Sequence, residues 1–416
     1  MKLFSLAGFG LCCLVSHAVQ SQQRVTSSDL LATVYTDRAV TLQEDQVNYY
    51  QRKIKSLHFV DQVSLRTRTD EFDRARQDYS ARLKVNGLGE MYRSRGLQQA
   101  DLGTVQAQKA DLFHDALFDR YSQLARYFSL EKEVALRRKM KIVCEDKIRV
   151  LEQIALYSED ADPDEMMKTD FEKDELALKI SVNETEIAQI KGWFGAIFPN
   201  IDSLQIDTTG LISTEKMLLL INGRPDSVNT NPGIFEKEAE IAKIRAEYHL
   251  EESKQLQTLD FIQLRYNQRS DLPQFYKFDV AVGVTLPYNG SNRVKKSELV
   301  IEQHAAEQEL LLYRENLQRL VAENFREMKG LESQRTIVQQ QIAGARSRYA
   351  PEKNTSLDKN GVRALLQFEE MQLKRTLRLT EIDRSIAEHY LEILYLTGRM
   401  SQQPLLNYLR SDLAGF

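Results

Sequence analysis

Two hydrophobic patterns alternate along this chain. Long stretches repeat apolar residues at every third or fourth position, which predicts amphipathic helices, and short stretches alternate apolar with polar residues, which predicts strands. In chain order we expect a helix at 30–57, strands at 63–69 and 80–88, a very long helix at 96–157, a helix ending near 193, a helix at 234–257, strands at 259–268 and 278–286, and helices at 294–349 and 362–396. The patterns therefore predict a mainly α fold with a small β part.

The same order of elements occurs twice. Each half contains a helix, two strands, a long helix, a polar break and a further helix, and the breaks fall at Ser158–Asp164 and Ala350–Gly361. An internal repeat is a strong indication of architecture. The prediction is a leader at 1–18, a first structural repeat at 19–198, an equatorial linking segment at 199–232, a second structural repeat at 233–398 and a C-terminal equatorial segment at 399–416.

The long helices carry the apolar spacing of coiled coils. Steps of mostly three and four residues connect Leu310, Tyr313, Leu317, Leu320, Asn324, Met328 and Leu331, and likewise Leu379, Ile382, Ile386, Tyr390 and Ile393. This spacing predicts antiparallel, supercoiled packing of neighbouring helices. A helix of about 55–60 residues rises about 80–90 Å, so it must lie against other helices of this chain or of other subunits. A coiled-coil rod without a channel is the alternative.

The clearest strand alternates strictly. Its apolar positions are Phe278, Val280, Val282, Val284 and Leu286, which are candidates to face lipid. A tilted strand of about 9–11 residues spans a bilayer, and strands in a membrane must belong to a closed barrel. Four strands cannot close around a pore, so several copies of the chain would have to contribute. Arg82 and Lys84 in an earlier strand are then tolerable only if they face a watery lumen, and a small water-exposed sheet is the alternative.

The N-terminus predicts export. Lys2 precedes an apolar stretch at 3–15, and the small residues Ser16 and Ala18 offer a cleavage site, so 1–18 is expected to be a secretory signal peptide rather than a buried helix. Removal of this segment leaves Cys144 alone, and one cysteine cannot form an intramolecular disulfide. The exported protein must then be held together by packing or by oligomerisation.

Composition and motifs argue against several other classes of protein. With 28% charged residues and a mean hydropathy of -0.45 the chain is not a polytopic helical membrane protein, and 56 basic against 60 acidic residues imply no nucleic-acid partner. No phosphate-binding, hydrolase or zinc-protease motif occurs, so we expect no enzyme activity, cofactor or metal. The pairs Glu251-Glu252 and Glu369-Glu370 diverge by about 100° on a helix and are interpreted as solvated helix faces.

Four segments carry a resemblance to a known family. They are Asp279–Arg293, Gly361–Arg375, Leu391–Gly398 and Asn231-Pro232 with the charged helix that follows. Together with the duplicated layout, they make the chain similar to the TolC-like outer-membrane efflux proteins. The resemblance covers nearly the whole chain after the leader.

This resemblance implies a homotrimer in the cell outer membrane, with most of the chain in the periplasm. Each subunit would give four strands to a shared transmembrane barrel, and the long helices would form an α-helical tunnel. The segments 198–232 and 399–416 would form a belt around the tunnel. A periplasmic adaptor and an inner-membrane pump would dock at the tips. The predicted function is an outer-membrane channel subunit that conducts small molecules or proteins in tripartite efflux or type I secretion, and a periplasmic coiled-coil scaffold without a pore is the alternative.

The helical tip departs from the family pattern. Positions that are acidic in the family's best-known member match Leu365 and Phe368 here, so an apolar constriction replaces the acidic gate as our hypothesis, with core packing as the alternative. The candidate tip and gate residues are Leu365, Phe368, Asp162, Pro163 and Pro351. Nothing in the sequence identifies the cargo.

Overall fold

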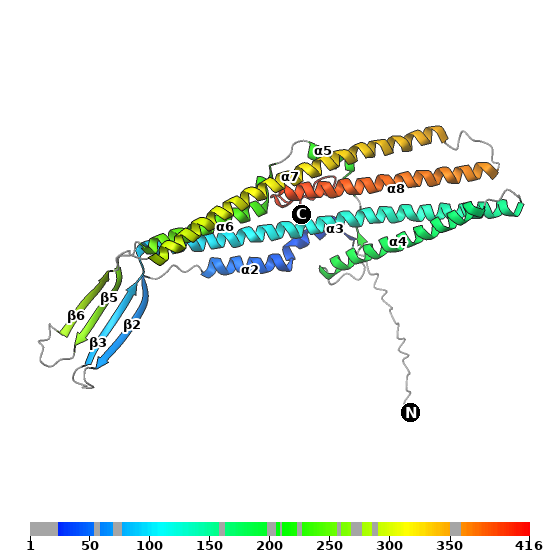
Figure 1. Ribbon diagram of the computed structural model, residues 1–416. Coiled ribbons are helices and arrows are strands. Elements are labelled where there is room, and N and C mark those ends of the chain that lie inside the picture. Colours follow the sequence, from blue (N-terminus) through cyan, green and yellow to red (C-terminus); the bar gives the residue numbers. More distant parts are fainter. Residues whose placement is uncertain are drawn as a thin grey trace, which may run out of the picture.

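The computed structural model describes residues 24–53, 59–69, 77–157, 163–197, 205–208, 210–222, 227–255, 259–267, 277–284, 290–349 and 359–416. Within these ranges, long helices lie side by side and a four-stranded sheet extends from one end of them (Figure 1). The predicted signal peptide lies outside the described residues, as do the candidate residues Asp162, Leu286 and Pro351.

The order of the predicted elements is confirmed. The helices are α1 Ser27–Ala32, α2 Arg38–Lys53, α3 Leu88–Tyr157, α4 Pro163–Ile197, α5 Thr214–Asn222, α6 Pro232–Gln255, α7 Gly290–Tyr349 and α8 Lys359–Leu396. The strands are β1 Arg24–Val25, β2 Val60–Thr69, β3 Gln77–Val85, β4 Gln205–Ile206, β5 Leu259–Asn267 and β6 Phe278–Val284, and short 3₁₀ turns occur at Thr33–Thr36, Val228–Thr230 and Arg399–Ser401.

Three details of the pattern reading were wrong. The helix expected at 30–57 is divided, because Asp37 is extended between the 3₁₀ turn and α2. Leu88, expected at the end of a strand, begins α3, which has 70 residues and a length of about 105 Å. The linking segment 199–232, for which the pattern predicted neither helix nor strand, contains the helix α5, whose Met217, Leu218 and Ile221 are buried.

Local chemistry explains where α4 begins and where α8 ends. Pro163 is the first residue of α4, where a missing N–H costs nothing, and Asp164 and Glu165 follow in the first turn. Gly398 ends α8 with a φ of 72°, and a Cβ there would lie 2.3 Å from the carbonyl oxygen of Thr230. Only glycine fits this left-handed, crowded position.

The long helices form a layer in the order α4, α3, α8, α7 (Figure 1). Nearer the sheet, α6 packs between α3 and α7. The largest core cluster joins α1, α3, α4, α5, α8 and the C-terminal segment, and it includes Ile382, Ile386, Tyr390 and Ile393 of the predicted α8 stripe. Within the described ranges, none of the helices is both long and apolar enough to cross a membrane.

Candidate functional site: an amphipathic sheet and a charged helical end

The four-stranded sheet is antiparallel throughout, in the order β2-β3-β5-β6. Its register aligns Val63 with Leu83, Leu83 with Ile262, and Ile262 with Val282. Directly paired residues share a face of a sheet, so one face collects the apolar residues of all four strands. These are Val63, Leu65, Tyr79, Ala81, Leu83, Ile262, Leu264, Tyr266, Phe278, Val280 and Val282, with Val284 paired to Leu259 beyond a bulge.

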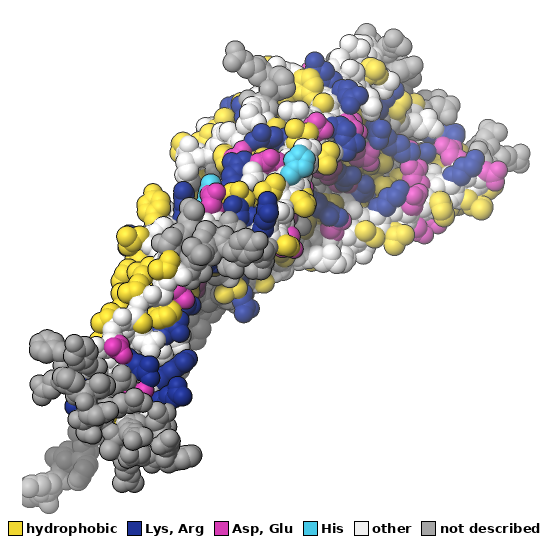
Figure 2. All heavy atoms as spheres, turned by 60° about the vertical axis from the view of Figure 1, so that its left-hand side comes forward, with side chains coloured by type: hydrophobic (Ala, Val, Ile, Leu, Met, Phe, Trp, Pro, Cys, Tyr) yellow, Lys and Arg dark blue, Asp and Glu magenta, His cyan; other side chains and the backbone are white. Residues whose placement is uncertain are grey.

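In the single chain this apolar face is exposed to solvent. Leu65 is 80% exposed and Val280 is 69% exposed, and hydrophobic side chains cover much of the sheet surface seen in Figure 2. Contiguous exposed apolar surface of this kind marks a site of contact with lipid or with another protein. The four described candidates at positions 278, 280, 282 and 284 all lie on this face, which β2, β3 and β5 extend.

The opposite face of the sheet is polar. Arg82, Lys84 and Arg265 lie on it and form ion pairs: Arg82 with Asp260 at 3.7 Å, Lys84 with Asp61 at 3.0 Å, and Arg265 with Asp78. The one aromatic ring there, Phe261, lies 3.5 Å under the Arg82 guanidinium. Its ring also occupies the space above Gly283, where a Cβ would come within 2.1 Å of it. The sheet is therefore amphipathic, with its charges on one side.

At the other end of the molecule, charged side chains connect three helices. Glu165 of α4 binds Arg363 of α8 and lies 3.5 Å from Lys147 of α3. Lys147 also lies 3.3 Å from Glu370 of α8. We call this set, together with Lys374 and Glu172, the end network.

The end network depends on charges that are partly withdrawn from water. Lys374 donates to Glu370 at 2.6 Å and to Glu172 at 2.5 Å. Burial alone raises the pKa of Glu370, yet Lys374 and Lys147 outweigh it and hold the pKa below its usual value. Glu370 is therefore charged at neutral pH, and its removal would leave two lysines without their shared partner.

The interpretation of the paired acids as solvated was wrong for one member of each pair. Glu370 lies in the end network, with a side chain 12% exposed. Glu251 is 5% exposed and accepts from Lys254 at 2.8 Å and from Lys295 of α7 at 2.9 Å. Adjacent residues on a helix do diverge, but a neighbouring helix covers one of the two.

A third charged centre lies deeper in the layer, where α3, α4 and α8 meet. The carboxylate of Glu133, only 3% exposed, receives Arg137 and Arg384 at 2.9 Å each. The amide of Asn183 on α4 lies 3.4 Å from the same carboxylate. Removing one partner of such a buried set leaves a charge uncompensated, so this centre fixes the three helices in register.

The remaining tip candidates lie near the end network without joining it. Leu365 is 39% exposed, Phe368 is partly buried, and both belong to the first turns of α8. Pro163 is exposed at the start of α4. Sequence reading missed Lys147, Glu165 and Lys374, because their partners lie on other helices and no local spacing marks them.

Comparison with solved structures shows that known proteins share this architecture. A structure of the outer membrane protein VceC from Vibrio cholerae matches with a TM-score of 0.64 at 10% identity, over 89% of this chain and 96% of that chain. The Neisseria gonorrhoeae MtrE outer membrane channel, in its open state, matches with a TM-score of 0.64 at 11% identity, over 93% and 90% of the two chains. The chain has the fold of these outer-membrane proteins.

A third structure agrees. CusC, solved in a study of folding and transmembrane channel formation, matches with a TM-score of 0.65 at 11% identity, over 89% of this chain and 92% of that chain. No protein-family profile matches the chain and no curated protein matches its sequence. The predicted resemblance is thus confirmed as a fold, which extends over nearly the full length of each neighbour.

Proposed function

We propose that this protein is a subunit of an outer-membrane export channel. The observation that carries the proposal is the amphipathic sheet, which joins one exposed apolar face and one charged face to long helices in an outer-membrane channel fold. A bilayer would cover the apolar face, and a water-filled lumen would hydrate the charged one. The chain itself is a passive conduit, and energy would come from its partners.

The sheet needs further copies of the chain to enter a membrane. Its outer strands β2 and β6 each have one edge without a partner in the four-stranded order. Open edges leave backbone groups unpaired in hydrocarbon, so a membrane requires closure. Three copies would join β6 of one subunit to β2 of the next and close a barrel of twelve strands. This homotrimer is the assembly that the family resemblance implies.

The helices would then continue the barrel as a tunnel in the periplasm. The layer of α4, α3, α8 and α7 would form its wall, and the segments 199–232 and 399–416 would form the belt. The ends of α3, α4, α7 and α8 would be the tips, where an adaptor and an inner-membrane pump dock for efflux or type I secretion. The leader at 1–18 would direct export to the outer membrane.

The end network would act as a latch on a closed tip. It ties α8 to α3 and α4 through Glu165, Glu370 and Lys374, so an outward swing of α8 has to break these contacts. Leu365 and Phe368 are the residues predicted to form an apolar constriction of that tip, but Leu365 lies eighteen residues, or five full turns, before Asp383 and so on the belt side of α8. Replacement of the latch carboxylate in Glu165→Gln would favour the open state.

Two adjacent residues on β6 test the proposal. Val280 is on the apolar face and Ala281 on the charged face. In membranes from expressing cells, the wild type should resist extraction and run as a trimer in mild detergent. Val280→Asp should lose both properties, because a carboxylate in hydrocarbon costs about 2.5–3.5 kcal/mol per copy, whereas Ala281→Asp should keep both.

A wild-type chain released as a soluble protein would refute the channel and favour the scaffold alternative. Equal behaviour of the two aspartate variants would refute the assignment of the faces.

A further inference from the structure

A basic groove lies beside the end network. It has a volume of about 470 Å³ and is open on one side. Its lining residues are Lys147 of α3 and Gln367, Glu370, Met371, Lys374, Arg375 and Arg378 of α8. Four of these seven side chains are cationic and one is a carboxylate. In Figure 2, Lys and Arg side chains lie interspersed with Asp and Glu over the helical end.

Two of the four cations are poorly neutralised. Arg375 donates from Nη1 to the backbone carbonyl of Gln341 on α7 at 3.1 Å, which carries no net charge. Among the described residues, no carboxylate lies within ion-pair distance of Arg375. Arg378 pairs at 3.2 Å with Glu381, three residues on along the same helix, and its side chain is 61% exposed. Such an exposed pair is weak and leaves the guanidinium available to solvent ions.

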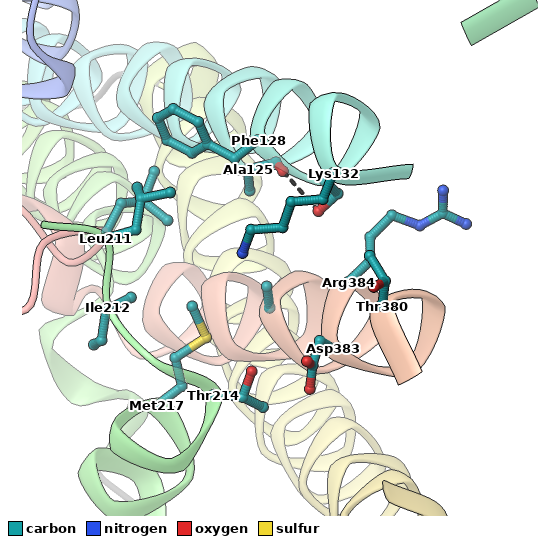
Figure 3. A pocket seen from close by; sticks show the side chains of 13 residues that line it. Ala125, Phe128, Lys132, Leu211, Ile212, Thr214, Met217, Thr380, Asp383 and Arg384 are labelled. Atoms are coloured by element: carbon teal, nitrogen blue, oxygen red, sulfur yellow. Dashed lines mark hydrogen bonds between the residues drawn. The ribbon is translucent and has the colours of Figure 1, made fainter. Parts of the chain in front are cut away.

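The groove faces away from the belt. A second pocket, on the belt side of α8, is lined by Thr380, Asp383, Arg384 and Ala387 together with Leu211, Met217 and Leu409 of the belt segments (Figure 3). Each of these four α8 positions lies nine residues after a residue that lines the groove. The groove residues are, in the same order, Met371, Lys374, Arg375 and Arg378. Nine residues at 100° each are two and a half turns. The two sets therefore occupy opposite sides of α8.

The neighbours of α8 fill the sides between these two faces. Arg384 binds Glu133 on α3, and Arg375 binds Gln341 on α7, so a helix flanks α8 on each side. If the belt segments lay on the lumen side of α8, they would fill the tunnel. The belt therefore lies on the outer side of the tunnel wall. The groove on the opposite side then faces the lumen.

We propose that this groove lines the lumen near the tip and makes the channel selective for anions, so that its cargo is negatively charged solutes. The inference rests on the proposed channel function. Rings of Lys and Arg side chains favour anions in pores, as rings of Asp and Glu favour cations. Three copies would repeat the excess positive charge around one lumen, and their fields reach about 10 Å at 0.1 M salt.

Recordings from the full-length trimer in planar bilayers test this, with a potassium chloride gradient across the membrane. The reversal potential of the wild type should show preference for chloride over potassium. In Arg375→Glu/Arg378→Glu the permeability ratio of chloride to potassium should fall about threefold or more, because the local field changes sign. Lys216→Glu/Arg410→Glu makes the same change in charge on the belt, where Lys216 donates to the Ser411 carbonyl and Arg410 binds Asp412, and should leave the ratio unchanged.

The outcomes separate the two proposals. Absence of any conductance in the wild type would contradict the channel function. A conducting wild type without preference for chloride, or a groove variant that conducts with an unchanged ratio, would overturn the inference about anions. If the Glu variant does not assemble, Arg375→Gln/Arg378→Gln removes the charge with smaller changes and should lower the ratio in the same direction.

Discussion

A half-buried acidic cluster between α3 and α6 provides a quantitative prediction. Asp111 and Asp115 of α3 lie near Glu236 of α6, and the Tyr395 hydroxyl donates to Asp115 Oδ1 at 2.7 Å. Burial raises the pKa of Asp111 to about 6, and the charges of Asp115 and Glu236 add to the effect. Tyr313 of α7 adjoins the same acids. Ionised Asp111 is therefore a source of strain at neutral pH.

The magnitude follows from the shift. The pKa rises from 3.8 to about 6, and each unit corresponds to about 1.4 kcal/mol. The carboxyl is only about half withdrawn from water, so we discount the sum to about 1–2 kcal/mol. Because the folded-state pKa is the higher one, the penalty is absent below pH 3.8, grows as the pH rises, and is complete above pH 6. Asp111→Asn should therefore stabilise the fold at pH 7.5 by about 1–2 kcal/mol and by less at pH 5.

Thermal unfolding followed by helical circular dichroism, in the same detergent at pH 5 and pH 7.5, measures this difference. Asp101→Asn is the matched control on α3. It removes the same charge, but Asp101 forms an ion pair with Lys243 of α6 at 3.1 Å, so its loss should be neutral or destabilising. His114, three residues further along α3, has a pKa lowered by burial, so it is neutral at pH 7.5. If Asp111→Asn shifts the midpoint equally at both pH values, or not at all, the reasoning is refuted.

Three further substitutions test separate parts of the structure. Gly283→Val should disrupt the sheet and lower the yield of trimer, since the new Cβ would lie 2.1 Å from Phe261. Adding Phe261→Ala in the same chain should restore the trimer yield. If Gly283→Val alone assembles normally, the close packing is refuted. Ile386→Ala at the 0% exposed centre of the core should cost about 2–5 kcal/mol, measured as a lower unfolding midpoint, and Val362→Ala at an exposed position should cost little. Leu365→Asp and Phe368→Asp should raise single-channel current and preference for cations if these residues form the constriction, and unchanged current and selectivity would exclude that role.

Periodicity predicted the elements because their apolar stripes are long. The α8 stripe at Ile382, Ile386 and Tyr390 is buried as its spacing indicates. Boundaries were harder to predict. Leu88 was assigned to the strand with Leu83 and Val85, but β3 ends at Val85, and Asn86-Gly87 separates it from α3. The short helix α5 lacks the several turns that make a period recognisable.

The charged contacts were beyond prediction for a different reason. Glu370 forms an ion pair with Lys147, which is 223 residues away in the sequence, and Glu251 forms one with Lys295, which is 44 residues away. The patterns of each helix show which face is polar, but not whether water or another helix meets that face. Arg82 and Lys84 lie opposite the apolar face, because a strand has only two faces and the apolar residues occupy one of them.

Helix α8 meets a different part of the chain on each of its sides. One side contacts α3 through Arg384, another contacts α7 through Arg375, and a third, with Thr380 and Ala387, meets the belt. The remaining side keeps Lys374 and Arg378 over an open groove. A tunnel wall requires a hydrated side, and in the proposed channel the side of α8 with this open groove would face the lumen.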